Sequence, residues 1–299
     1  MLSFKKELVI ILITVSLVFA SGCIEFGEDE EPAAYGLTIE TLEAIPSQVF
    51  SGDTFELVLD VRNLGGVEAR EIEPELYTAG GASTTDDFTP SSVGSLNPPT
   101  ADFEGEGASF SLDMSAPTLS VSDETVRPEV RVPYKYKTES RILIPVLHEE
   151  EYRAIEGTDE TVPRIEKARV TDGPFTVDIT GPNPGRVGDG DIEVPFTVSG
   201  SNIGGGTAYL ESGHPSPGTD DLNRIDIDVD IDHDDFDMSE DACDESSIRL
   251  RKDGSFHISC TMSFDGDIDD VTFEEVPVSL TLDYGYRIRQ RTSAYVRRD

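Results

Sequence analysis

Alternating acidic side chains are the first candidates for chemistry in this sequence. The stretch from Arg224 to Asp241 alternates four apolar residues with four acidic ones, namely Ile225, Ile227, Val229 and Ile231 with Asp226, Asp228, Asp230 and Asp232. In a β-strand this pattern gathers the aspartates on one face, where clustered oxygens could bind calcium. We favour the alternative, a solvated acidic strand face that discourages pairing between sheet edges.

A second acidic segment, Asp265 to Glu275, resembles a calcium loop through Asp265, Asp267 and Asp269. An EF-hand loop needs glycine at its sixth position and glutamate at its twelfth, where Asp270 and Val276 stand instead. We therefore keep these three aspartates as weak calcium candidates and predict no other metal site and no cofactor.

The residue types of common catalytic sites do not occur at catalytic spacing. The four histidines are scattered along the chain at His148, His214, His233 and His257. The sequence has no nucleophile-elbow motif, no phosphate-binding loop and no paired-cysteine motif. We therefore expect a protein that is not an enzyme, and an acidic-surface hydrolase is the least favoured class.

Two cysteines, Cys243 and Cys260, follow the predicted signal and tether segments. Segments 247–250 and 255–259 read as hairpin strands around a turn at Lys252 to Gly254, which brings the two cysteines near each other. An exported protein can be oxidised, so we predict a Cys243–Cys260 disulfide. Two buried free thiols are the alternative.

The N-terminus indicates export. Lys5 and Lys6 precede an apolar run that ends at Ala20, which is the layout of a signal peptide over residues 1–22. Residues 20–23, Ala-Ser-Gly-Cys, resemble the lipobox of prokaryotic lipoproteins, although alanine stands where that family prefers leucine. The resemblance implies a lipid-modified Cys23, an acidic tether over residues 23–35 and a place on the outer face of the cell membrane. An unmodified cysteine after an ordinary signal peptide and an uncleaved N-terminal helix are the alternatives.

The charge balance is strongly acidic. The chain has 60 acidic and 23 basic residues, a formal charge of -37 and a sequence pI near 4.2. This composition resembles proteins of extreme halophiles, in which dense counterions screen the repulsion between carboxylates. The same charge argues against nucleic acid as a partner and against electrostatic attraction to anionic lipid.

A repeated strand pattern gives the architecture. Residues 55–61 alternate apolar and polar side chains and lead into a turn at Asn63, and residues 192–198 do the same before Asn202. Tyr134 and Tyr136 recur as Tyr284 and Tyr286, at positions where alternation predicts core packing. We therefore predict an all-β protein with two tandem antiparallel immunoglobulin-like β-sandwich domains. Their limits are residues 36–148 and 168–299, joined by a linker over residues 149–167 that is extended or carries a short helix.

Turn residues at matching positions also resemble CARDB and related immunoglobulin-like modules of archaeal surface proteins. The first copy matches at Pro46, Gly52, Asp53, Asn63, Gly65 and Ala69, and the second at Pro184, Gly188, Asp189, Asn202, Gly204 and Ala208. The resemblance implies binding, spacing or presentation at the cell surface, without catalysis.

These observations together predict a membrane-anchored surface lipoprotein of a halophilic archaeon that binds a protein or glycan partner or organises the envelope. We expect the binding surface on loops such as Thr78 to Pro99 or Glu211 to Asn223, because loops vary while sheets hold their position. An accessory subunit of a membrane transport, secretion or surface-filament complex is the alternative function.

Overall fold

The computed structural model describes residues 36–156, 163–188, 193–213, 220–239, 243, 246–266 and 272–298. Residues 34–299 form one compact unit. The predicted signal peptide, Cys23, the acidic tether and the calcium candidates Asp267 and Asp269 lie outside the described residues.

Two small antiparallel sheets correspond to the two copies of the repeat. The first contains β1 (Leu37–Ile45), β3 (Thr54–Asn63) and β7 (Gly107–Ser115), in that order. The second contains β11 (Phe175–Thr180), β13 (Glu193–Asn202), β18 (Ser255–Phe264) and β16 (Phe236–Met238). The central strands β3 and β13 carry the predicted alternation, which turns Leu57 and Phe196 into the core. Strand β3 therefore has β13 as its counterpart.

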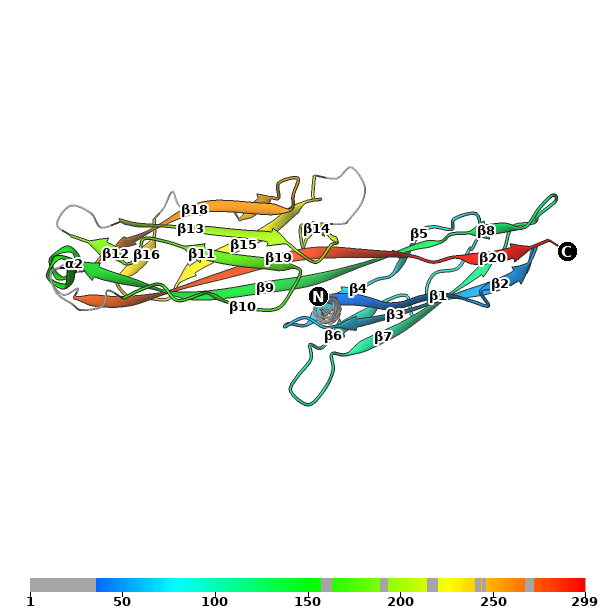
Figure 1. Cartoon of the computed structure of the whole chain (residues 1–299), viewed down its shortest axis with the longest axis horizontal. Helices are drawn as coiled ribbons and strands as arrows, with labels where there is room; N and C mark the ends of the chain where they lie inside the picture. The colour runs from blue at the N-terminus through cyan, green and yellow to red at the C-terminus, as the bar shows by residue number, and fades with distance from the viewer. Residues whose placement is uncertain are drawn as a thin grey trace, which may run out of the picture. The chain divides into compact units, whose positions relative to one another are not determined.

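A long third sheet covers the apolar faces of both small sheets. Its centre is the antiparallel pair β9 (Glu129–His148) and β19 (Phe273–Arg291), which stay paired from Phe273 opposite Leu147 to Arg291 opposite Glu129. Figure 1 shows these two strands side by side through both halves of the described chain. Shorter strands extend this sheet on both sides: β4 (Ala69–Ile72), β5 (Glu75–Thr78), β6 (Val93–Leu96), β10 (Arg169–Val170), β12 (Gly185–Val187), β14 (Thr207–Tyr209), β15 (Arg224–Ile231) and β17 (Ser247–Arg249).

The two halves exchange their last strands. We call the half around β1, β3 and β7 the first lobe and the half around β11, β13 and β18 the second lobe. The C-terminal part of β9 belongs to the first copy but pairs with β10 and β12 in the second lobe. The C-terminal strand β20 (Ala294–Arg297) belongs to the second copy but lies between β2 (Gln48–Phe50) and β8 (Glu124–Val126) in the first lobe. Each lobe therefore contains strands from both of the predicted segments, 36–148 and 168–299.

The exchange follows from an approximate twofold relation between the copies. Tyr134 lies opposite Tyr286 and Tyr136 opposite Tyr284, so the approximate twofold axis passes between Lys135 and Gly285, where the equivalent strands β9 and β19 are paired. The four tyrosines are fully buried and meet mostly edge to face, with ring centroids 5.8–6.3 Å apart. The prediction that they are core residues is confirmed.

The asparagine turn of each copy is anchored under a tyrosine from the long pair. In the first lobe the Asn63 amide donates to the carbonyls of Val67 (2.7 Å) and Leu96 (2.8 Å), and the Tyr136 hydroxyl accepts from Val67 N (3.3 Å). In the second lobe Asn202 donates to Gly206 O (3.0 Å), and the Tyr286 hydroxyl donates to Asn202 Oδ1 (2.6 Å). A short amide side chain suits both turns because it satisfies backbone groups that the turn leaves without strand partners.

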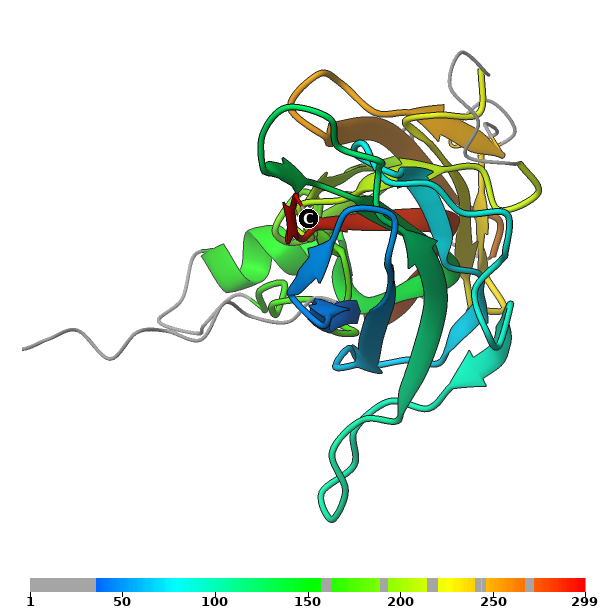
Figure 2. The ribbon, with the colours of Figure 1, turned by 90° about the vertical axis from the view of Figure 1, so that its right-hand side faces the viewer.

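The connector between the copies carries the helix α2 (Glu149–Glu156), which buries none of its residues. Seen end-on in Figure 2, the sheets surround a shared interior and α2 lies outside them. Within the described ranges, no helix is long and apolar enough to cross a membrane.

The Cys243–Cys260 disulfide is present, with a Cα–Cα distance of 5.2 Å. The prediction that a hairpin of residues 247–250 and 255–259 brings the cysteines together is wrong. Strand β17 pairs with β15, whereas β18 pairs with β13 and β16. The cysteines meet because β16 runs beside β18, with Met238 opposite Met262. The predicted fold class is confirmed in its architecture, with nearly all described elements β-strands in mostly antiparallel sheets; β12 with β9 and β2 with β20 are parallel pairs.

Candidate functional site

The acidic strand lies where its alternation predicts. Ile225 and Ile227 of β15 are buried, while the aspartates between and after them face the other side. Beyond Asp226, β19 is the one strand partner of β15 among the described residues, so that Asp228 and Asp230 stand along a sheet edge there. Charged residues along such an edge hinder pairing with other chains.

The calcium candidates receive no support as a group. Asp265 is exposed directly after β18, and its two partners Asp267 and Asp269 lie outside the described residues. Among the described residues, no three acidic, histidine or cysteine side chains are placed to share a metal ion.

The first predicted binding loop, residues 78–99, is held to the sandwich. Phe88 is buried in the core, Ser83 bridges to Ser115, and Thr89 bridges to Ser111. The second predicted loop, residues 211–223, is described only at its two ends.

The outer face of β9 carries cations in both lobes, and those at the lobe junction are paired with carboxylates. We call Arg70, Lys135 and Lys137 the paired cluster. Their side-chain nitrogens lie 3.0 Å from Glu211, 2.7 Å from Glu71 and 2.6 Å from Glu139, respectively. On the neighbouring strand β19, Arg289 and Arg291 both contact the buried carboxylate of Glu129 at the start of β9. In these positions the cations neutralise a neighbouring acid.

Three further cations on the same sheet face form what we call the open cluster: Arg141, Lys167 and Arg169. Arg141 on β9 lies directly opposite Arg169 on β10, and Lys167 precedes Arg169 by two residues, so that all three side chains share one face. Within the part of the chain that the structure describes, none of the three makes an ion pair or a side-chain hydrogen bond. Like charges directly opposite each other destabilise a sheet, so this arrangement favours a bound anion.

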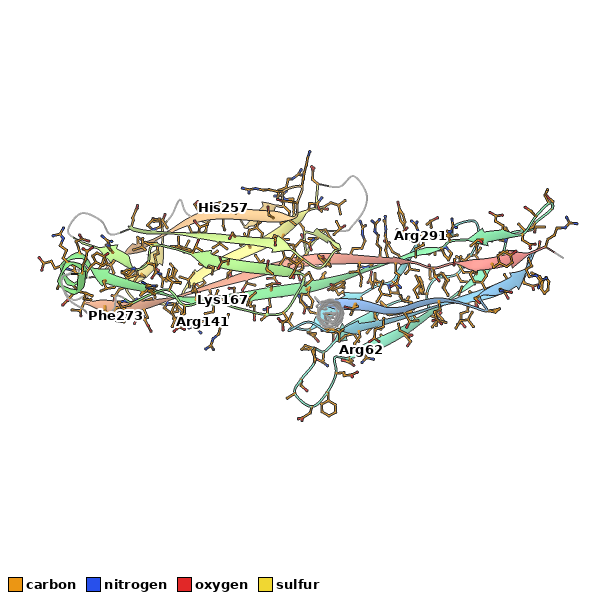
Figure 3. The ribbon with its side chains drawn as sticks, in the orientation of Figure 1. Arg62, Arg141, Lys167, His257, Phe273 and Arg291 are labelled. Atoms are coloured by element: carbon orange, nitrogen blue, oxygen red, sulfur yellow. A yellow bond between two sulfur atoms is a disulfide. The ribbon has the colours of Figure 1, made fainter. Side chains whose placement is uncertain are left out.

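The open cluster surrounds a pocket of about 320 Å³. Figure 3 shows Arg141 and Lys167 close together along the side of the second lobe, with Arg141 reaching outward from it. Ile142, Leu143 and Glu166 complete the lining, and Leu143 is 40% exposed. A guanidinium group binds carboxylate, sulfate or phosphate oxygens through two parallel hydrogen bonds, and the lysine adds a third positive charge. The arrangement can hold an extended anion. The carboxylate of Glu166 also lies at the rim of the pocket.

The paired cluster differs from the open cluster because acidic side chains of the protein lie beside it, and two of these have raised pKa values. Burial, with the nearby charge of Glu211, raises the pKa of Asp283 above its ordinary value. Burial likewise raises the pKa of Asp226, although a hydrogen bond from the backbone of Glu211 opposes this shift. Asp226 and Asp283 are directly opposite each other on β15 and β19. The cations of the paired cluster therefore lie among carboxylates of the protein itself, which already neutralise them.

The open cluster was missed by sequence reasoning because Arg141 is far from Lys167 and Arg169 in the chain. The spacing of Lys167 and Arg169 was the available signal, since a period of two puts both on one face of an extended segment.

No protein-family model matches this chain, and no curated protein matches it. Among solved structures, that of the Enterococcus faecalis MSCRAMM ACE is similar to the structure of this chain, and ACE is described as binding its ligands by the collagen hug model. The two chains are 10% identical, the similarity covers 87% of this chain and 95% of that chain, and the TM-score is 0.15. A similarity at this level supports no argument about fold or function.

Proposed function

We propose that this chain is a non-enzymatic, lipid-anchored surface protein of a halophilic archaeon that binds an anionic polysaccharide of the cell envelope. The open cluster is the observation that carries the binding role. Among the described residues, none of its three cations forms an ion pair with a carboxylate, on a chain in which acids outnumber bases 60 to 23. The acidic composition and the Ala20–Cys23 segment support the proposed environment and anchor.

The ionic environment favours a polymer over a small anion. In molar salt the screening length is about 3 Å, so only direct contacts between opposite charges retain strength. A ligand must then bring several anionic groups into contact at once, as a chain of uronate or sulfated sugars does. Arg141, Lys167 and Arg169 offer neighbouring contacts on one exposed sheet face. We therefore expect neutral sugars to bind poorly.

Binding can be tested with residues 34–299 in molar KCl. The probes are fluorescein-labelled oligogalacturonate, sulfated dextran and neutral dextran, and binding is followed by fluorescence anisotropy. The test variant combines Arg141→Ser, Lys167→Ser and Arg169→Ser. The matched control combines Arg70→Ser, Lys135→Ser and Lys137→Ser, which removes the same charge from the same sheet face.

We expect both polyanions to bind and the neutral polymer not to bind. Losing two or more contact ion pairs should weaken binding by about tenfold or more in the test variant, which corresponds to about 1.4 kcal/mol. The control should stay within about threefold of the wild type, since its cations already have protein partners. Equal losses in both variants, or equal binding of neutral dextran, would contradict the proposal.

The anchor is tested by the intact mass of the protein extracted from membranes of a high-salt host. A mature chain that begins at a lipid-modified Cys23, and that is lost in Cys23→Ser, is the expected result. A chain that begins at Met1 without modification would show that the N-terminal segment stays as an uncleaved anchor.

A second candidate function, an accessory subunit of a larger membrane complex, is favoured by exposed apolar residues where β20 joins the first lobe. Ile45, Phe50 and Tyr295 are 49%, 46% and 40% exposed there. Phe50 and Tyr295 lie on one face of neighbouring strands, which is a feature of surfaces that contact other proteins. Co-purification of a stoichiometric membrane protein, abolished by Phe50→Ser with Tyr295→Ser, would support this function.

A further inference from the structure

The two copies of the repeat differ in the charge of one equivalent connection. In the first copy residues 97–106 lead into β7, and in the second copy residues 250–254 lead into β18. The equivalence is fixed by the backbone, because Asn63 N donates to Glu106 O (3.0 Å) and Asn202 N donates to Gly254 O (3.1 Å). The strand registers agree as well, with Arg62 opposite Gly107 and Ser201 opposite Ser255.

These equivalent connections carry opposite charge. The first, which we call the acidic loop, contains Asp102, Glu104 and Glu106, and its tip residue Phe103 is 76% exposed. Arg62 at its base is the nearby cation: it contacts Glu40 (2.6 Å), lies 3.9 Å from Glu104 and donates to Gly105 O (2.8 Å). The loop therefore presents a net negative charge around an unburied aromatic ring.

The second connection, which we call the basic turn, contributes Arg251, Lys252, Asp253 and Gly254 to the wall of a pocket. The pocket has a volume of about 600 Å³, and Arg249, Leu250 and Leu222 also line it. Asp253 bonds to Ser255 within the turn, and Arg249 lies 3.5 Å from the exposed Asp220. The pocket thus combines a positive rim with apolar side chains.

The acidic loop and the basic turn of one molecule do not face each other. The approximate twofold at Lys135 and Gly285 relates the copies, so equivalent connections project in opposite directions. Figures 1 and 2 both show the loop before β7 and the turn before β18 on opposite sides of the described chain. A contact between them therefore needs two molecules.

We propose that the acidic loop of one molecule docks into the basic pocket of a second copy of this chain. Phe103 enters the pocket between Leu222 and Leu250, and Asp102 and Glu104 contact Arg251 and Lys252. Because the two surfaces differ, the contact is heterologous, and each pair leaves one loop and one pocket open for the next molecule. The assembly is then a linear array.

Salt should favour this array. At low salt the -37 charge of each chain repels its neighbour, whereas molar salt screens the long-range repulsion and leaves contact pairs and apolar burial in place. The array should therefore form in molar KCl and dissociate on dilution into low salt.

The test is sedimentation equilibrium of residues 34–299 in molar KCl over a range of concentrations. One variant, loop-reversed, carries Asp102→Arg and Glu104→Arg, and another, turn-reversed, carries Arg251→Glu and Lys252→Glu. Each variant alone has two surfaces of like charge, but a mixture of the two restores opposite charges at every contact. Circular dichroism shows that each variant is folded, and Asp86→Arg with Asp87→Arg in an exposed loop is the control for the change in charge.

We expect the average mass of the wild type and of the control to rise with concentration past that of a dimer. Each reversed variant alone should stay monomeric, and the equimolar mixture should recover the rise. Phe103→Ser should weaken association by about tenfold, as expected when a buried aromatic contact is lost. A wild type that is monomeric throughout, a mass that stops at the dimer, or a mixture of folded variants that fails to associate would each overturn the proposal.

Discussion

Asn63 and Asn202 make similar hydrogen bonds in the two lobes, whereas the cations on the outer face of β9 do not have similar partners. Inside, each asparagine holds its turn against a tyrosine of the long strand pair. Outside, Lys135 and Lys137 contact carboxylates, while Arg141 and Lys167 contact none among the described residues. The interior is thus alike in the two copies, whereas the surface differs from place to place, in the pairing of its cations and in the opposite charges of the acidic loop and the basic turn.

This contrast separates the scaffold from the proposed binding surface. The interior specifies two sandwiches that share β9 and β19, and changes there should cost stability. The surface contains an open cluster, a paired cluster, an acidic loop and a basic turn, and changes there should affect binding with little effect on folding.

The largest expected effect is on stability at the asparagine turns. Asn63 is fully buried and makes three hydrogen bonds, to Val67, Leu96 and Gly65. Asn63→Ala should lower the free energy of unfolding by about 4 kcal/mol, because three buried backbone groups lose their partners. Asn202→Ala should cost about 2 kcal/mol, because its turn is partly exposed and water can replace the lost bonds. Urea unfolding in molar salt measures both, and a larger loss for Asn202→Ala would break the comparison.

The disulfide is a feature of the second lobe alone, since the sequence has no cysteine between Cys23 and Cys243. It closes a loop with a sequence separation of 17. Replacing both Cys243 and Cys260 by serine should lower stability by about 3 kcal/mol. Hydrogen exchange should then rise first in β16 and β18 of the second lobe. An equal rise in β1 and β7 would show that the lobes do not differ in this respect.

A smaller effect is expected from pH at the acidic side chains beside the paired cluster. Burial raises the folded pKa of Asp226 and Asp283 above their unfolded values. The protonated carboxyls therefore favour the folded state. Their contribution to stability is present below pH 4 or so and is lost as pH rises from about 4 through the raised pKa values, because the ionised carboxylates oppose folding. Asp226→Asn should raise stability at pH 7 by less than about 1 kcal/mol, since the site is partly exposed. Thermal unfolding at pH 4 and 7 checks this, with no gain at pH 4; a loss at pH 7 would contradict it.

Much of the fold was predictable because it depends on local alternation. The strands around Leu57 and Phe196, the buried tyrosines and the disulfide all follow from apolar periodicity or from the compartment that the N-terminus implies. The strand exchange was not predictable, because β9 and β19 have the same alternation whether they pair within a copy or between copies. Only the non-local register, with Tyr134 opposite Tyr286, decides between them.

The candidate site was less predictable than the fold. Whether a cation is paired depends on its cross-strand neighbours, and Arg141 meets Arg169 only through the pairing of β9 with β10. The loop at residues 78–99 was expected to be free for binding, but Phe88 fixes it to the core. Composition gave the overall charge of the surface and could not say which of its cations lack an acidic partner.

The most direct test of the binding account uses the lysines as reporters. Beyond Lys6 the chain has four lysines: Lys135 and Lys137 in the paired cluster, Lys167 in the open cluster and Lys252 in the basic turn. Residues 34–299 are acetylated at low extent in molar KCl, with and without saturating oligogalacturonate, and each site is quantified by mass spectrometry. The account predicts that the ligand slows acetylation of Lys167 by about tenfold at about ten times the Kd and leaves Lys135 and Lys137 unchanged. Protection of Lys135 and Lys137 with none at Lys167 would contradict it.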